Sequence, residues 1–431
     1  MVLGTEYLSI PMPENFVREK FLGNFEIFEK MVENVNEKYD EDIINRLKYE
    51  IFRLNILKRN YDLTRKKLIL ELEKYIKDFD TKNIDYFIKN GTLDRIFING
   101  EERFFNKSPE NLHYLNKKLF ENSSYNISPY KNFLEFVSRK ISSGNLNNYR
   151  IEYEISINLN KNVAYKVWIP LPTENYYQKN VKILETYPRY YKILEGPQRA
   201  IYFYDTSNVF KARISVETRD INIRDGDMDS KKDLYLEERN PHVSFNRYME
   251  KIVRNLTRNE NENIKKIIKI YKHITETITF VFPRSYILYD NISEYSLFNM
   301  LGDSTMQSIL LIALMRSLNI PARWRGGYSI IENNIMPHHW VEIYTEEYGF
   351  IPVDPVFGNF SLGHYYLRDF YFGNMEGLRI ITSEDFNVDF SEAGKFWRID
   401  PITNEIGEVE TDSEKILDYD TKIKLINIET L

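Results

Sequence analysis

Three side chains in the last third of the chain have the types and order of a nucleophile, a general base and a carboxylate that orients the base. Ser304 stands directly before an apolar run, His338 is followed by His339 and Trp340, and Asp354 precedes a proline. A hydroxyl at the start of a helix is surrounded by backbone N–H groups and the positive end of the helix dipole, which stabilise developing negative charge. A histidine within reach can remove its proton, and an aspartate can hold that histidine in place. Ser304, His338 and Asp354 could therefore form a set for nucleophilic catalysis.

Other interpretations of the same residues are structural. Serine is among the best residues for capping the start of a helix, so Ser304 could simply be an N-cap. His338 and His339 are adjacent on a predicted strand and point to opposite faces, so they cannot both bind one metal ion. A zinc site formed by His338, His364 and Asp354 lacks a recognisable ligand spacing. We therefore expect no metal and no cofactor, and we expect His339 to be a packed or surface residue.

The elements around these side chains can be predicted from hydropathy. Residues from Met306 to Met315 are almost all apolar, which is typical of a helix buried on every side. Asn319 can adopt the left-handed conformation that ends helices, and Pro321 prevents continuation. Antiparallel strands are predicted next, over residues 322–330, 340–344 and 350–353. The nucleophile would therefore lie at the helix start, and the base and the carboxylate on two adjacent strands.

The composition limits the classes of protein to which the chain can belong. At 431 residues it exceeds the size at which one hydrophobic core stops growing, about 250–300 residues, so two or three domains are expected. The net charge of −6 argues against a nucleic-acid partner, because binding to phosphates requires clustered Lys and Arg. The sequence contains no apolar run of the roughly 18–20 residues that a membrane span needs, and its first residues do not resemble a secretion signal. The absence of Cys is compatible with a reducing compartment, so we expect a cytoplasmic protein.

The chain divides into three regions. Residues 1–141 are predicted to be mostly helical, with a β-hairpin around Asn99-Gly100, a strong signal for a two-residue turn. A polar run from Ser142 to Asn148 is predicted to be a linker. Residues 149–220 alternate apolar and polar side chains with a period of two, which predicts a small β-rich, sandwich-like domain. Residues 242–431 would form the third domain and its C-terminal extension.

Several segments of the third domain resemble the core of the transglutaminase-like superfamily in their order and spacing. They are Gly302 to Ser304, Leu310 to Trp324, His338 to Tyr344 and Tyr348 to Pro355. More narrowly, the chain is similar to bacterial transglutaminase-domain proteins, which carry a β-rich domain before the core. That similarity rests on Phe370 to Asn374, Arg379, Arg398 to Pro401, Gly407-Glu408 and, in the β-rich region, Trp168 to Pro172.

The resemblance implies an α+β fold in which a buried helix packs on an antiparallel sheet, as in papain-like proteins. It maps the catalytic Cys, His and Asp of the family onto Ser304, His338 and Asp354. The implied activity is amide acyl transfer or hydrolysis, of the transglutaminase or peptidase type, through a covalent acyl-enzyme. The implied substrate is a polypeptide or another amide-bearing molecule. No cofactor, nucleic acid or membrane partner is implied, and the oligomeric state is not predicted.

The departure from the family falls on the nucleophile. A thiol at a helix start beside an imidazolium is deprotonated near neutral pH, whereas a hydroxyl is a far weaker acid. Ser304 therefore predicts little or no turnover. The serine is explained by a natural loss of catalysis, by an engineered change from Cys to Ser, or by a genuine serine hydrolase. The alternative from a different class is a non-catalytic protein that binds a peptide or a glycan in the groove of the fold.

Overall fold

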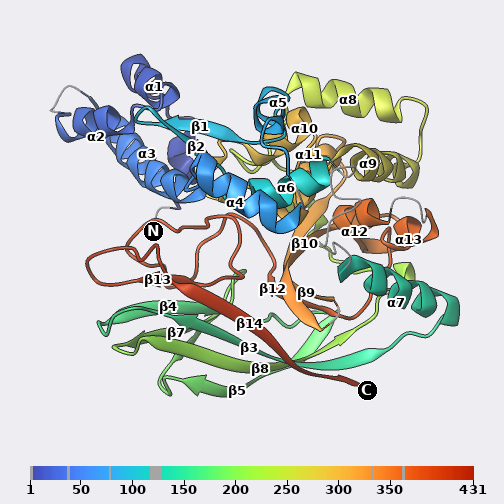
Figure 1. Ribbon diagram of the computed structural model, residues 1–431. Helices are drawn as coiled ribbons and strands as arrows, with labels where there is room; N and C mark the ends of the chain where they lie inside the picture. The colour runs from blue at the N-terminus through green and yellow to red at the C-terminus, as the bar shows by residue number, and fades with distance from the viewer. Residues whose placement is uncertain (1–2, 36–38, 77–78, 117–128, 332, 362–364) are drawn as a thin grey trace.

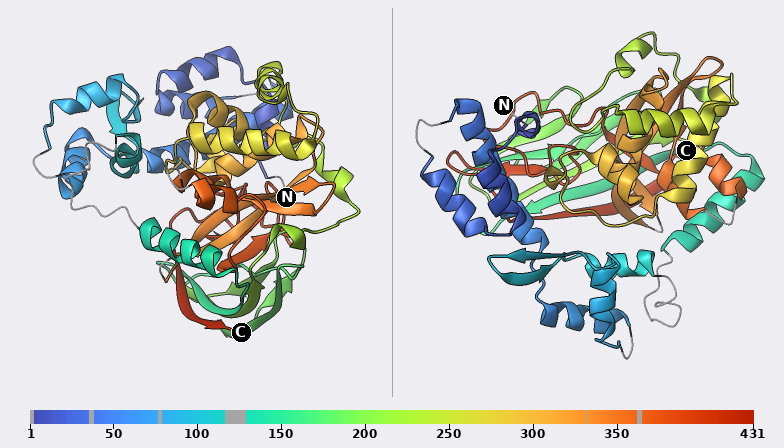
Figure 2. Two further views of the ribbon diagram at one scale, coloured as in Figure 1. Left: turned by 90° about the vertical axis from the view of Figure 1, so that its right-hand side faces the viewer. Right: turned by 90° about the horizontal axis from the view of Figure 1, so that it is seen from above.

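Most helices gather on one side of the molecule and two four-stranded sheets on the other, with a third four-stranded sheet between them (Figure 1). The computed structural model describes residues 3–35, 39–76, 79–116, 129–331, 333–361 and 365–431. Figure 2 shows from two further sides that the N-terminal helices flank the helices of the C-terminal region, while the β-rich region forms its own layer. The α+β class predicted from the sequence is confirmed.

The N-terminal region is mostly helical because its apolar residues recur every three to four positions, as Leu47 and Leu54 do on the buried side of α3. Its helices are η1 (Thr5–Ser9), α1 (Glu14–Phe21), α2 (Phe25–Glu33), α3 (Glu41–Asn60), α4 (Arg65–Tyr75), α5 (Asn83–Lys89), α6 (Ser108–Leu115) and α7 (Pro129–Ser143). The predicted hairpin is confirmed, with β1 (Arg95–Ile98) paired to β2 (Glu101–Phe104). Asn99 and Gly100 have φ of 50° and 82°, the left-handed pair that this tight turn requires.

The β-rich region is a sandwich of two four-stranded antiparallel sheets. One has the order β14-β3-β8-β5 and the other β13-β4-β7-β6. Their strands are β3 (Asn148–Asn158), β4 (Tyr165–Pro170), β5 (Gln178–Tyr187), β6 (Lys192–Leu194), β7 (Ala200–Asp205), β8 (Val209–Arg219), β13 (Glu408–Glu410) and β14 (Asp420–Thr430). Every second residue of β3 is buried, as the alternation predicted, and these side chains share one core with those of β4, β7 and β8.

The C-terminal extension returns to the β-rich region. β14 pairs with β3 along nearly its whole length, from Asp420 opposite Asn158 to Thr430 opposite Tyr149. β13 pairs in the same way with β4 in the other sheet. This extension, predicted to belong to the third domain, supplies two strands that complete the sheets of the second.

The remaining residues form a helical layer packed on a sheet of order β11-β10-β9-β12. The elements are α8 (Arg247–Thr257), α9 (Asn263–Thr277), η5 (Tyr286–Leu288), α10 (Ile292–Asn299), α11 (Ser304–Arg316), β9 (Ala322–Ile331), β10 (Asn334–Thr345), β11 (Gly349–Val353), α12 (Pro355–Phe360), α13 (Tyr365–Phe370) and β12 (Arg379–Ser383). Before α8 lie two short 3-10 turns, η3 (Ile223–Asp225) and η4 (Lys232–Tyr235).

The helix predicted to be buried is buried along its whole length. Every residue of α11 is buried, and its apolar side chains share one core with Val341 and Ile343 of β10. Asn319 follows with φ 59°, the left-handed conformation expected after the helix end. On the other side of the molecule, Tyr328 and Ile330 of β9 reach into the core of the sandwich, so the sheet joins the two regions.

Candidate active site

The start of α11 is capped by Asp303, so the interpretation of Ser304 as the N-cap is wrong. The Asp303 carboxylate accepts a hydrogen bond from the Met306 N–H at 3.1 Å, and Ser304 is the first helical residue. Asp303 also accepts a hydrogen bond from the Tyr286 hydroxyl, which ties η5 to the helix start. Ser304 therefore lies within the first turn, where free N–H groups and the helix dipole favour negative charge.

The Ser304 hydroxyl contacts a histidine, but not the one predicted. Ser304 Oγ lies 3.2 Å from Nδ1 of His339, and the Thr305 hydroxyl lies 2.9 Å from the same nitrogen. Among the hydrogen bonds of the described residues, none joins Ser304 to His338. In the neutral ring with its proton on Nε2, Nδ1 accepts from these hydroxyls, and in the charged ring it donates to them. Ser304 itself is only 7% exposed.

A carboxylate lies on the far side of the His339 ring. Glu405 Oε1 is 3.1 Å from His339 Nε2, and both residues are buried. The ring of His339 stacks on the indole of Trp324 with the centroids 4.8 Å apart. Burial by itself would lower the pKa of His339, but Glu405 and nearby acidic groups outweigh burial and raise this pKa above its ordinary value. A hydroxyl, an imidazole and a carboxylate thus follow one another, from Ser304 through His339 to Glu405.

Gly326 on β9 leaves room for this arrangement. A Cβ added at Gly326 would lie 2.7 Å from Nε1 of Trp324, 3.0 Å from Cδ2 of His339 and 3.2 Å from Oε1 of Glu405. Such distances are shorter than ordinary van der Waals contacts. The absence of a side chain at this position therefore lets the ring of His339 and the Glu405 carboxylate come together beside the strand.

His338 and Asp354 are brought together, as predicted. Nε2 of His338 lies 2.6 Å from Oδ2 of Asp354, whose other oxygen accepts a hydrogen bond from the Phe357 N–H at 2.9 Å. The same carboxylate pairs with Arg379, which Glu376 holds at 2.6 Å. The His338 ring stacks on Phe357 with the centroids 4.4 Å apart. Asp354 is therefore shared between a histidine and an arginine.

Burial and charge act on these two groups in opposite ways. Burial lowers the pKa of His338 below its ordinary value, although Asp354 opposes this shift. Burial alone would raise the pKa of Asp354, but His338 and Arg379 hold it well below its usual range. Asp354 is thus ionised near neutral pH, and His338 is largely neutral.

The two adjacent histidines have different neighbours because successive residues of a strand point to opposite faces. Val341 and Ile343 share the side of His339 and pack in the core that contains α11. Trp340 shares the side of His338 and packs in a separate cluster. The expectation that His339 is merely a packed or surface residue is therefore incomplete, since this buried ring contacts Ser304.

Sequence reasoning missed His339 and Glu405 as candidate functional residues. A signal for His339 was present, because Val341 and Ile343 had to face the buried helix and His339 alternates with them. Glu405 lies beyond the last strand predicted for the core, and no local pattern marks it. His364, the third member of the zinc alternative, lies outside the described residues.

Residues 250–355 match a family profile described as the transglutaminase-like superfamily. This span contains Ser304, both histidines and Asp354. The chain carries a transglutaminase-like core.

Several solved structures resemble the chain at low sequence identity. A candidate cysteine protease from Cytophaga hutchinsonii is 15% identical over 67% of this chain and 91% of its own, with a TM-score of 0.45. The periplasmic domain of TgpA from Pseudomonas aeruginosa is 11% identical over 52% of this chain and 93% of its own, with a TM-score of 0.29. A candidate protease from Parabacteroides distasonis is 10% identical over 47% of this chain and 46% of its own, with a TM-score of 0.24. No curated protein matches the chain.

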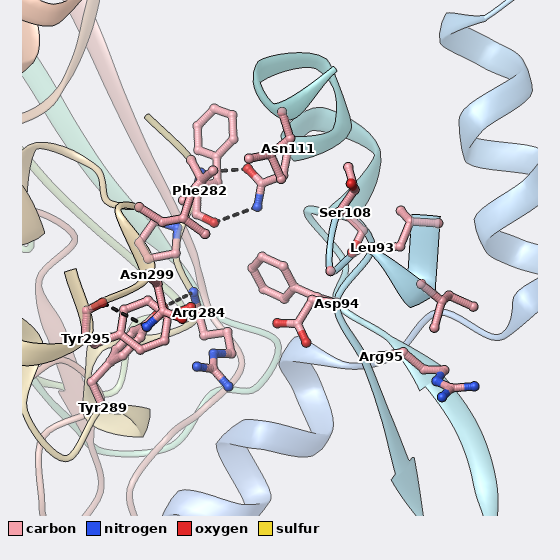
Figure 3. A pocket seen from close by; sticks show the side chains of 18 residues that line it. Leu93, Asp94, Arg95, Ser108, Asn111, Phe282, Arg284, Tyr289, Tyr295 and Asn299 are labelled. Atoms are coloured by element: carbon pink, nitrogen blue, oxygen red, sulfur yellow. Dashed lines mark hydrogen bonds between the residues drawn. The ribbon is translucent and has the colours of Figure 1, made fainter. Parts of the chain in front are cut away.

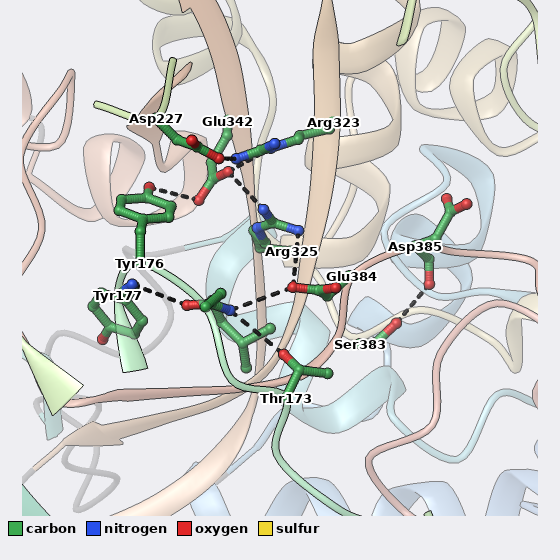
Figure 4. Close-up of polar contacts among 12 residues, drawn as sticks. Thr173, Tyr176, Tyr177, Asp227, Arg323, Arg325, Glu342, Ser383, Glu384 and Asp385 are labelled. Atoms are coloured by element: carbon green, nitrogen blue, oxygen red, sulfur yellow. Dashed lines mark hydrogen bonds and ion pairs between the residues drawn. The ribbon is translucent and has the colours of Figure 1, made fainter. Parts of the chain in front are cut away.

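The transglutaminase-like core holds a buried carboxylate, Glu342, on the strand that carries the two histidines. Glu342 on β10 pairs with Arg323 at 2.7 Å and with Arg325 at 3.0 Å, both on β9 (Figure 4). The Tyr176 hydroxyl, from the loop before β5, donates a hydrogen bond to Glu342 at 2.9 Å. Arg323 also pairs with Asp227 at 2.6 Å. This network holds β9 and β10 together and attaches the β-rich region to the core beside the candidate site.

None of the helices in the described parts of the chain combines the length and the apolar character that crossing a membrane requires.

Proposed function

We propose that the transglutaminase-like core carries out amide acyl transfer or hydrolysis with Ser304 as the nucleophile, at a slow rate because a hydroxyl stands where the family has a thiol. The observation that carries this proposal is the 3.2 Å contact between Ser304 Oγ and His339 Nδ1 at the start of α11. It joins a nucleophile to a base at a helix N-terminus, where backbone N–H groups stabilise the negative charge of a tetrahedral intermediate.

The reaction would proceed through an acyl-enzyme. Nδ1 of His339 takes the Ser304 proton while Oγ forms a bond to the carbonyl carbon of the amide. The C–N bond then breaks, and the imidazolium returns that proton to the leaving amine. Water, or a second amine in transfer, attacks the resulting ester with His339 again as base, and the Ser304 hydroxyl is restored. Glu405 stabilises the imidazolium in both steps. An amide-bearing substrate such as a polypeptide satisfies this chemistry.

The geometry also explains why turnover should be slow. The hydroxyl of Thr305 lies 2.9 Å from the same nitrogen, Nδ1 of His339, and competes with Ser304 for a hydrogen bond to it. Ser304 is only 7% exposed, so an acyl group has little access to Oγ. A serine is also a weaker acid than the cysteine expected at this position, so its proton must be removed during attack.

Two histidines compete for the role of base. The resemblance to the family favours His338 with Asp354, and the contact with Ser304 supports His339 with Glu405. Because both histidines lie in β10 and both are buried, matched Asn variants of the two are good controls for each other.

The test compares the natural chain with Ser304→Cys and Ser304→Ala on chromogenic peptide amides and esters. We expect slow ester cleavage by the natural chain, none by Ser304→Ala, and a clear gain of amide and ester cleavage by Ser304→Cys. In the Cys background, His339→Asn should lower kcat by about 10²–10⁴-fold, the usual contribution of a general base, and His338→Asn should lower it much less. The reverse order would assign the base to His338.

A second candidate function is non-catalytic binding of a peptide or glycan by the groove of the fold. The serine at position 304 favours it, because a hydroxyl in place of the family's thiol removes the reactive thiolate while the rest of the core is kept. Inactivity of the Ser304→Cys variant on every peptide amide and ester, together with peptide or glycan binding measured by calorimetry, would replace the enzymatic proposal with this one. Strong activity of the natural chain that Ser304→Ala abolishes would instead show an efficient serine hydrolase.

A further inference from the structure

A pocket of about 390 Å³ lies between the N-terminal region and the transglutaminase-like core (Figure 3). One wall comes from residues 91–95 and α6, and the other from residues 281–284, α10 and the segment that leads to α11. The walls are held together by Asn111, whose side chain donates to the carbonyl of Phe282 at 2.9 Å and accepts from the N–H of Phe282 at 2.7 Å. The volume falls within the range of about 300–1,000 Å³ that is typical of small-molecule sites.

Arg284 gives the core wall of this pocket a positive charge without a counter-ion. Its guanidinium stacks on Tyr289 and Tyr295, at 5.0 and 5.5 Å from the ring centroids. Among the described residues, no carboxylate lies within ion-pairing distance of it. Its polar neighbours are tyrosine hydroxyls, those of Tyr61 at 3.5 Å and of Tyr289 and Tyr295. Burial alone would lower the pKa of Arg284, but Tyr61, Tyr289 and Asp94 outweigh burial and raise this pKa. The guanidinium is charged, and no carboxylate pairs with it among the described residues.

The opposite wall supplies a carboxylate and a hydroxyl. Asp94 accepts a hydrogen bond from Tyr61 through Oδ2, at 2.6 Å, and in the described part of the chain no hydrogen bond is donated to its other oxygen. Ser108 also lines the pocket, and its buried hydroxyl has no hydrogen-bond partner among the described residues. Figure 3 shows the Asp94 carboxylate and the Arg284 guanidinium facing the same space from the two sides. The pocket therefore presents one positive and one negative group.

We propose that this pocket binds a small zwitterion of the amino-acid or dipeptide class, with its carboxylate on Arg284 and its ammonium group on Asp94. A guanidinium offers the paired donors that suit a carboxylate, and the tyrosine rings can pack against a short side chain. A phosphate group would be repelled by the Asp94 carboxylate, so a doubly anionic ligand fits less well.

This site gives the N-terminal region a role in ligand binding, since residues of that region complete the pocket. It does not depend on the reaction proposed for Ser304, because Ser304 is not part of the lining. Binding can therefore be measured in the Ser304→Ala variant, in which the dipeptide cannot be hydrolysed.

The experiment is isothermal titration calorimetry of the full chain carrying Ser304→Ala, with Ala-Ala, N-acetyl-Ala-Ala, Ala-Ala-amide and inorganic phosphate as probes. We expect Ala-Ala to bind, and each blocked dipeptide to bind about tenfold or more weakly, as the loss of one charge-assisted hydrogen bond predicts. Arg284→Met should abolish binding of Ala-Ala and of N-acetyl-Ala-Ala. Asp94→Asn should weaken Ala-Ala but leave N-acetyl-Ala-Ala unchanged.

Arg95→Met is the matched control for charge. Arg95 also lines the pocket, but its guanidinium pairs with Glu102 at 3.2 Å and points away from Asp94 in Figure 3, so binding should be unchanged. Arg284→Lys keeps the charge and should retain weaker binding, and melting temperatures verify that each variant is folded. Equal binding of the blocked and free dipeptides, tighter binding of phosphate, no heat with any probe, or unchanged binding in Arg284→Met would each overturn the proposal.

Discussion

Burial lowers the pKa of both adjacent histidines, and the charges around them decide that the two pKa shifts have opposite directions. Asp354 is shared with Arg379, whose positive charge opposes protonation of His338. Glu405 faces His339 without a competing cation of this kind in the described residues, and Asp303 adds to its effect. The charge of each ring near neutral pH is therefore decided by groups from other parts of the chain.

We predict that the two rings titrate on opposite sides of the ordinary histidine pKa of 6.5, His339 above it and His338 below it. Glu405→Gln should lower the pKa of His339 and leave that of His338 nearly unchanged, because it removes only the carboxylate beside His339. Long-range proton–nitrogen correlation spectra recorded through a pH titration measure both values without any need for activity. The exposed Glu346→Gln serves as the control and should move neither pKa. An unshifted His339 in Glu405→Gln would contradict the pairing.

The same shifts set the direction of the stability change. A pKa raised on folding adds stability below the unfolded value, and this stability is lost as the pH rises through the folded value. His339 therefore favours folding most at about pH 6 and least at about pH 9, so Glu405→Gln should reduce the free energy of unfolding more at the lower pH. His338, with its lowered pKa, contributes stability above its unfolded value and loses it as the pH falls.

At the scale of elements, the site depends on how closely β9 passes the His339 ring and the Glu405 carboxylate. Gly326 sits at the closest approach, where a Cβ would lie within 3.2 Å of three other side chains. Gly327 beside it has φ +155°, and its added Cβ would lie 2.0 Å from the Ile380 carbonyl oxygen of β12. The pairing of β9 with β12 shifts register here, between Ile381 and Ser383. Gly326 therefore leaves room for the His339 ring and the Glu405 carboxylate, and Gly327 leaves room for the backbone of β12.

We predict that Gly326→Ala lowers the free energy of unfolding by about 1–3 kcal/mol, the usual cost of overpacking a core, and displaces His339 from Glu405. The displacement should appear as a lower His339 pKa in the same titration spectra. Gly144→Ala is the control, since no atom lies within 4 Å of the added Cβ and only its φ of +66° opposes the change. The control should lose some stability and keep the His339 pKa. If Gly326→Ala left both the free energy of unfolding and the pKa of His339 unchanged, the strand would be able to move aside.

Across the whole molecule, a buried ionic cluster attaches the N-terminal region to the core. Glu50 of α3 pairs with Arg46 at 2.5 Å, with Arg53 at 2.8 Å and with Lys20 at 2.7 Å. Arg53 then donates to the carbonyl oxygen of Ile287 at 2.8 Å and pairs with Asp290 at 2.6 Å. Ile287 belongs to η5, the turn that is also tied to the helix start by the hydroxyl of Tyr286. The N-terminal helices are thus linked through one short turn to the start of α11.

We predict that Arg53→Met costs about 3–5 kcal/mol in the free energy of unfolding, because it leaves the buried carboxylate of Glu50 with fewer cations and frees the carbonyl of Ile287. Arg59 lies on the same helix as Arg53 and makes an exposed ion pair with Asp418, near the C-terminus. Arg59→Met should therefore cost no more than about 1 kcal/mol. Urea unfolding at neutral pH compares the two. Equal losses would show that the cluster does not hold the N-terminal region to the core.

The sequence by itself determined the elements and the faces they bury. The apolar run before Pro321 predicted a buried helix. The alternation in residues 149–220 predicted strands with one buried face, and Asn99-Gly100 predicted a hairpin turn. These features are local, because they depend on helix and strand periods and on the backbone preferences of single residues. The neighbouring positions of His338 and Asp354 also followed from adjacent strands.

Only the tertiary structure decided which side chains meet across the fold. The partner of Ser304 is His339 because the apolar residues that alternate with it face α11, and the carboxylate beside His339 comes from Glu405, far along the chain. The return of β14 to β3 and the pocket between Asp94 and Arg284 likewise join distant segments. Such contacts depend on how whole elements pack, which no local period encodes. The identity of the histidine that contacts Ser304 is therefore a property of the fold, although every residue involved is visible in the sequence.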